Sequence, residues 1–159
     1  MRTLQAVGVL VALLTAFSAS RAADDDALKA GLKALEGKWE VTSCQKDGED
    51  QGDVVKIGIK LEFKDDNMEI TGSDPNFTPQ KRFIKLDVTT TPKLMDVAEK
   101  AEELKNGTKL LEGLYSVDGE TFKFCFQMDG DQPAKGKRPA SLESKAGSGV
   151  LLFTLKKVK

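Results

Sequence analysis

Histidine is absent from the 159 residues of this chain, which also has only two cysteines, one tryptophan and one tyrosine. Without histidine the chain cannot form a triad with an imidazole base, and most kinds of zinc site are excluded. The G-x-S-x-G, Walker-loop and dinucleotide-binding motifs are missing as well. We therefore expect a protein that is not an enzyme and that holds no metal ion and no cofactor.

A surplus of basic charge is also lacking. The chain has 24 basic and 25 acidic residues, and the two signs alternate along it. Binding of nucleic acid calls for a clustered basic face, so no nucleic-acid partner is expected. After the first 22 residues no apolar run approaches the roughly 20 residues that a membrane span requires, and we expect no membrane span in the mature chain.

The first 22 residues have the layout of a secretory signal peptide. An arginine near the start precedes an apolar run over 6–17, and Ser20 and Ala22 supply the small residues that precede a cleavage site. Residues 1–22 are therefore predicted to be removed. The remaining residues, 23–159, have the size of one domain, which we expect to be secreted or periplasmic and monomeric.

The mature chain changes its hydrophobic period once. Leu28, Leu32 and Leu35 are spaced as on one face of a short helix, for which Asp26 is a suitable N-cap and Gly37 a suitable end. After Gly37 apolar and polar residues mostly alternate, which is typical of half-buried strands. The predicted strands cover about 39–44, 54–63, 68–70, 84–88, 93–98, 108–117, 121–128 and 150–158.

Two segments interrupt this alternation. Residues 97–105 are strong helix formers that end at Asn106-Gly107, which predicts a helical turn between two strands. Residues 129–149 form a connection rich in Gly, Pro and Ser, and loops of this length are usually functional or flexible. The other connections are mainly short, so neighbouring strands are expected to pair antiparallel. Such strands form either a sandwich or a closed up-and-down barrel, and closure leaves no exposed sheet edge.

Three motifs favour the barrel. They are LEGKW at 35–39, GLYSVDGETFKFCF at 113–126 and KRPASLESKAGSG at 137–149, with L-x-x-L-K-K near the end. In this pattern the mature chain resembles a family of small secreted bacterial domains of unknown function, abundant in planctomycetes, and more distantly the lipocalin and calycin barrels. The helical insert at 97–105 departs from the family pattern. The resemblance implies an all-β fold of about eight antiparallel strands in an up-and-down, lipocalin-like barrel with a short N-terminal helix.

The resemblance also implies a role for the single tryptophan. In lipocalin-like barrels it closes one end and stacks against a basic side chain of the last strand. Here that end plug would consist of Gly37, Trp39 and Lys157, because pairing of the first and last strands brings Lys157 beside Trp39. A cation–π contact of roughly 0.5–2 kcal/mol is expected, and its role is structural.

The sequence provides arguments both for and against a disulfide between Cys44 and Cys125. An oxidising compartment favours a bridge, but both residues have the parity of outward-facing positions on the first and seventh strands. With the eighth strand between them, their Cα atoms would lie about 10 Å apart, which is too far for a disulfide.

The inward face of the barrel is the candidate binding site for a small apolar or amphipathic ligand, unless its own side chains fill it. The alternative is a protein-interaction or inhibitor module that acts through the 129–149 loop on a protein partner. On the same loop Arg138, Ser144 and Lys145 form a candidate rim site, where a polar group would be recognised. The inward-facing residues singled out as the ligand site are Ile57, Ile59, Leu61, Phe63, Ile84, Leu86, Tyr115, Phe122, Phe124 and Phe126.

Overall fold

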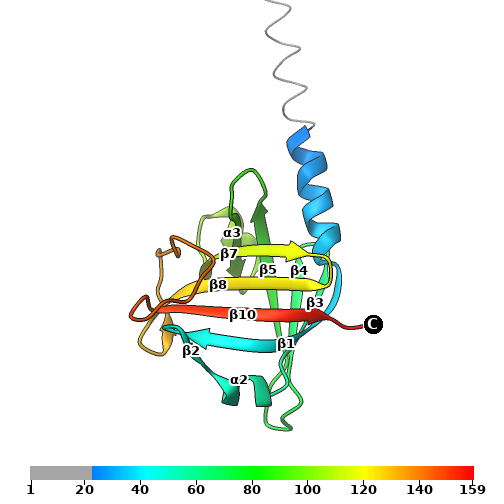
Figure 1. Ribbon diagram of the computed structural model, residues 1–159. Helices are drawn as coiled ribbons and strands as arrows, with labels where there is room; N and C mark the ends of the chain where they lie inside the picture. The colour runs from blue at the N-terminus through cyan, green and yellow to red at the C-terminus, as the bar shows by residue number, and fades with distance from the viewer. Residues whose placement is uncertain (1–22) are drawn as a thin grey trace, which may run out of the picture.

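Eight antiparallel strands close into a barrel in the computed structural model of the chain, which describes residues 23–159 (Figure 1). The signal peptide predicted for 1–22 lies outside the described residues. The strands follow the chain around the barrel, and the last pairs with both the first and the one before it, so the sheet has no open edge. They are β1 (Gly37–Lys46), β3 (Lys60–Lys64), β4 (Asn67–Thr71), β5 (Gln80–Asp87), β6 (Lys93–Ala98), β7 (Leu111–Asp118), β8 (Thr121–Asp129) and β10 (Val150–Lys157).

The remaining elements are short. Two-residue strands, β2 (Glu49–Asp50) and β9 (Gln132–Pro133), pair with the ends of β1 and β8. Helix α3 (Ala101–Lys105) is the helical turn predicted between two strands. Among the residues that the structure describes, no helix is long and apolar enough to cross a membrane.

An N-terminal helix over 23–35 precedes the barrel and packs on it through the predicted leucine face. Leu35 is fully buried, while Leu28 and Leu32 pack against the core. Gly31 allows the close approach, because a Cβ atom there would lie only 2.9 Å from Cγ1 of Val88. In Figure 1 this helix, in blue, and the C-terminus both lie on the right of the barrel.

One predicted strand is partly wrong. Residues 54–63 were expected to be continuous strand, but Gly52–Lys56 form the helix α2 and the strand begins only at Lys60. The break comes at Gly58, whose φ of +65° lies in the left-handed region. Alternation over so few residues fits a helical turn as well as a strand. Ile57 is therefore the C-cap of α2, and the prediction that it lies in the barrel interior is wrong.

The two ends of the barrel differ in their connections. The N-terminal helix, the turns at 65–66 and 119–120, and the C-terminus gather at one end, which we call the floor. The longer connections, 47–59, 72–79, 99–110 and 130–149, gather at the other end, which we call the mouth. The mouth therefore carries the long loops, and the N-terminal helix lies at the floor.

Candidate functional site: an apolar cavity at the barrel mouth

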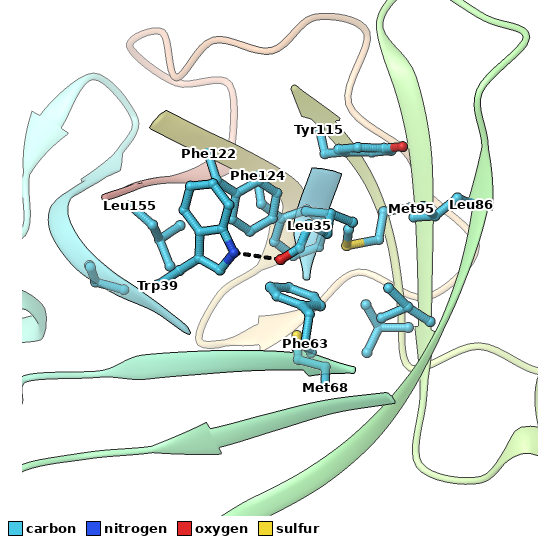
Figure 2. Packing of buried hydrophobic residues seen from close by; sticks show 13 residues of the cluster. Leu35, Trp39, Phe63, Met68, Leu86, Met95, Tyr115, Phe122, Phe124 and Leu155 are labelled. Atoms are coloured by element: carbon cyan, nitrogen blue, oxygen red, sulfur yellow. Dashed lines mark hydrogen bonds between the residues drawn. The ribbon is translucent and has the colours of Figure 1, made fainter. Parts of the chain in front are cut away.

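Trp39 closes the floor of the barrel. Its ring is fully buried, and Nε1 donates a hydrogen bond of 2.6 Å to the carbonyl oxygen of Leu35 (Figure 2). Lys157 pairs directly opposite Trp39, with Nζ 5.2 Å from the centroid of the indole. Gly37, whose φ is +108°, turns the chain from the helix into β1. The three residues of the predicted end plug therefore lie together.

Aromatic side chains fill the space above the tryptophan. The ring of Phe122 lies 5.6 Å from Trp39, 5.6 Å from Phe63 and 6.4 Å from Tyr115, in edge-to-face geometries between ring centroids. Figure 2 shows this cluster with Leu86 and Met95 beside it. Buried core side chains consequently fill the floor half of the barrel.

Tyr115 is the polar exception in this core. Its hydroxyl group is buried and has no hydrogen-bond partner among the described residues. Burial, with a smaller contribution from the charge of Asp87, raises the pKa of Tyr115 from 10.0 to about 12. The hydroxyl is therefore protonated at neutral pH.

The mouth half of the barrel is hollow. A cavity of about 200 Å³ lies there, and every side chain that lines it is apolar. Four residues that form its base are buried, and the other six are half-exposed, so the cavity opens to solvent. The base consists of Val41, Met68, Phe124 and Leu155, and the upper wall of Ile59, Leu61, Ile70, Leu111, Phe126 and Phe153.

The predicted ligand site is thus split between the two halves. Ile59, Leu61, Phe124 and Phe126 line the cavity. The remaining members, apart from Ile57, belong to the filled floor: Phe63, Ile84, Leu86, Tyr115 and Phe122.

Six further residues line the cavity. Two-residue alternation had placed five of them, Val41, Met68, Ile70, Leu111 and Phe153, on the predicted inward face, although they were not singled out as the ligand site. Leu155 was not on that predicted face, and the same alternation along β10 could have found it, because it has the parity of Phe153.

The two cysteines lie on opposite faces of the sheet. A bulge between Val41 and Ser43 shifts the register of β1, so that Cys44 pairs opposite Phe153 and shares its inward face. Cys125 has the outward parity expected for it and pairs opposite Leu152. Both thiols are free and buried, and the disulfide that the sequence left open is not formed.

We expect both thiols to be inert in the folded protein. Burial is the main cause that raises the pKa of Cys44 and of Cys125 from 9.0 to about 11. At pH 8 a disulfide-exchange reagent should titrate neither thiol on a time scale of minutes, and both after unfolding in guanidinium. Because each pKa is raised by folding, their contribution to stability is complete below pH 9 and is lost as pH rises through about 11. Rapid titration of either thiol at pH 8 would contradict their burial.

The 129–149 connection is pinned to the outside of the barrel. The guanidinium group of Arg138 donates a hydrogen bond to the carbonyl oxygen of Gly113 and pairs with Asp96, close to Glu112 and Lys109. Ser144 accepts a hydrogen bond from the amide of Gly48, 3.0 Å away, and donates one to the carbonyl oxygen of Val150, 2.8 Å away. Lys145 is exposed and pairs with Glu143. The three residues of the predicted rim site therefore do not converge on one point.

A second apolar cluster lies under this connection. Leu142 of the connection packs against it, and the thiol of Cys125 donates a weak hydrogen bond of 3.6 Å to the carbonyl oxygen of Ser141. The apolar side of the loop is consequently turned toward the barrel. The buried members of the cluster, on the outer face of β7, β8 and β10, are Leu114, Cys125, Val150 and Leu152.

Replacing Arg138 with Ala should loosen this loop. Asp96 and Glu112 would then share only Lys109, and we expect a loss of about 1–3 kcal/mol in the free energy of unfolding, together with faster proteolysis within 129–149. Urea denaturation and limited proteolysis measure the two effects. The control is Lys137→Ala, an exposed neighbour that should change stability by less than about 0.5 kcal/mol. Equal behaviour of the two variants would contradict the anchoring role of Arg138.

The mouth cavity therefore offers a ligand an apolar surface and no hydrogen bonds from side chains. Within residues 23–159, no three His, Cys, Asp or Glu side chains are grouped in a way that could hold a metal ion. Comparison of the chain with protein-family models, with curated proteins and with solved structures found no match. The mouth cavity is the feature from which a function can be argued.

Proposed function

We propose that the protein is a non-catalytic binding protein that takes one small apolar molecule into the mouth cavity. The observation that carries the proposal is a cavity of about 200 Å³ walled by ten apolar side chains, set between a filled floor and solvent. Water gains little there, because it needs about two to four polar partners. An apolar cavity of about 150 Å³ is enough to bind benzene, so this one has room for a single ring with a small substituent or for a short chain.

The size of the cavity also sets the affinity. Burial of six to eight carbon atoms at about 0.8 kcal/mol each gives a dissociation constant on the order of 0.1 mM. An amphipathic ligand would place its apolar part in the cavity and its polar group in the solvent at the mouth.

The proposal also includes where the protein is located. The apolar run over 6–17 supports export, and the motifs at 35–39, 113–126 and 137–149 support membership in the family of secreted bacterial domains. The protein would then act as a secreted or periplasmic monomer.

A titration with toluene tests the binding proposal. At ten times the dissociation constant, binding adds about 1.4 kcal/mol to the stability, and the melting temperature should rise by about 4 °C. Ile70→Trp fills the cavity and should abolish the rise. Ile57→Trp is the matched control, because Ile57 lies outside the cavity and that variant should keep it. An equal rise in both variants, or no rise in the unchanged protein, would contradict the proposal.

The alternative, a protein-interaction or inhibitor role through the 129–149 loop, takes second place. The apolar side of this loop packs against the barrel, so a partner would meet the exposed side chains of Lys135, Lys137 and Lys145. Native mass spectrometry of the protein, purified from the culture medium of the cells that secrete it, distinguishes the two roles. A bound small molecule supports the first role, and a bound protein supports the second.

A further inference from the structure

We infer that the mouth cavity selects one neutral aromatic ring over a saturated ring of the same size. This inference rests on the proposed function and specifies the class of its ligand. It follows from the strands that supply the lining. The three phenylalanines come from the neighbouring strands β8 and β10, aliphatic side chains come from β1, β3 and β4, and no lining side chain is polar.

Four phenylalanine rings, which we call the aromatic ladder, form a continuous row from the floor to the cavity. They are Phe122, Phe124, Phe126 and Phe153. Phe122, which packs on Trp39, is stacked 6.4 Å from Phe124, with 17° between the ring planes. Phe124 lies 5.6 Å from Phe126, and Phe126 lies 6.3 Å from Phe153 at 28°. These centroid separations are within the 4.5–7 Å range of favourable aromatic pairs. The last two rings are only half-buried, so the ladder ends at the empty space with ring surface uncovered.

The backbone explains why the ladder reaches the mouth. Three of its phenylalanines alternate along β8 and therefore point to one face of the sheet. On the neighbouring strand β7, Gly113 pairs opposite Phe126 and has no side chain to compete for the space. A Cβ atom at Gly113 would overlap the ring of Phe124. The strand beside the ladder is thus kept clear for the rings.

The opposite wall completes a slot. Ile59, Leu61 and Ile70 come from the segment at the start of β3 and from β4. The thioether of Met68 lies at the base, and sulfur makes favourable contacts with aromatic rings. A planar ring in this slot would meet aliphatic groups on one side and continue the ladder on the other. A charged ring would lose its hydration without gaining a polar partner, so the ligand is neutral.

Paired dissociation constants for toluene and methylcyclohexane test the inference, measured by headspace gas chromatography over the purified protein. Each dissociation constant is multiplied by the compound's own partition coefficient from water into hexadecane, which removes the difference in hydrophobicity. The unchanged protein should prefer toluene by about threefold to tenfold after this correction. In Phe153→Leu the preference should fall to about one. In the control Phe77→Leu, which removes a phenylalanine outside the cavity and the ladder, it should persist.

The outcomes separate the inference from the proposed function. If both compounds bind and the corrected preference is about one in the unchanged protein, the cavity is a binding site without aromatic selectivity, and the inference is wrong. The inference is equally wrong if Phe153→Leu and Phe77→Leu keep the same preference. If neither compound binds the unchanged protein, the proposed function itself fails.

Discussion

Replacing Trp39 with Ala is expected to lower the free energy of unfolding by about 3–5 kcal/mol. The indole is fully buried, packs against Phe122 at 5.6 Å and satisfies the carbonyl oxygen of Leu35, which the truncation would leave without this donor. Equilibrium urea denaturation, followed by circular dichroism because the only tryptophan is removed, measures the loss.

Two further variants divide this effect. Trp39→Phe keeps a ring in the plug but loses the hydrogen bond, and it should be less damaging than Trp39→Ala. Lys157→Ala removes only the cation that lies 5.2 Å from the centroid of the indole, a contact worth about 0.5–1 kcal/mol. A loss below about 1 kcal/mol for Trp39→Ala would show that Trp39 does not plug the barrel.

The second large effect is expected at Gly113, where replacement by Ala should reduce stability by about 3 kcal/mol. The added Cβ atom would overlap the ring of Phe124 and lie 2.7 Å from the carbonyl oxygen of Cys125, and the backbone of a central strand cannot easily move away. The variant should also disturb toluene binding, because Phe124 forms part of the base of the cavity. Urea denaturation measures the first effect and the toluene-induced melting shift the second.

Two control variants distinguish the steric overlap of a Cβ atom at Gly113 from the backbone strain of replacing a glycine. Gly130→Ala changes a glycine with φ +61° and nothing within 4 Å of the added atom, so only about 1 kcal/mol of conformational strain is expected. Combining Gly113→Ala with Phe124→Leu should recover part of the loss, because the smaller side chain makes room. If Gly113→Ala alone is no worse than Gly130→Ala, the close packing of the ring on β7 is wrong.

The strands and the N-terminal helix could be predicted because each depends on local pattern, whereas the closed barrel and its plug at Trp39 were implied by the resemblance. Alternation of apolar residues indicated the strands, and pairing of the first with the last placed Lys157 beside Trp39, as the register shows. The single apolar face of the N-terminal helix was readable in the spacing of Leu28, Leu32 and Leu35.

The rest depends on backbone events and tertiary contacts that alternation does not record. The turn at Gly58 delayed the start of a predicted strand and moved Ile57 out of the interior, and the bulge near Thr42 reversed the face of Cys44. The anchoring of the 129–149 loop depends on Arg138 meeting Asp96, 42 residues away. Inward parity identified wall residues, but it could not show which half of the barrel is filled, because that follows from the orientation of the rings.

The most direct test of the mouth cavity uses the four isoleucines of the chain. Ile59 and Ile70 line the cavity, Ile84 is buried in the filled floor, and Ile57 lies outside the barrel core. In a spectrum of protein labelled at the isoleucine δ1-methyl groups, saturating toluene should shift the Ile59 and Ile70 signals strongly through its ring current and leave Ile84 and Ile57 nearly unchanged. Shifts of similar size at all four methyl groups, or at none, would contradict a ligand site at the barrel mouth.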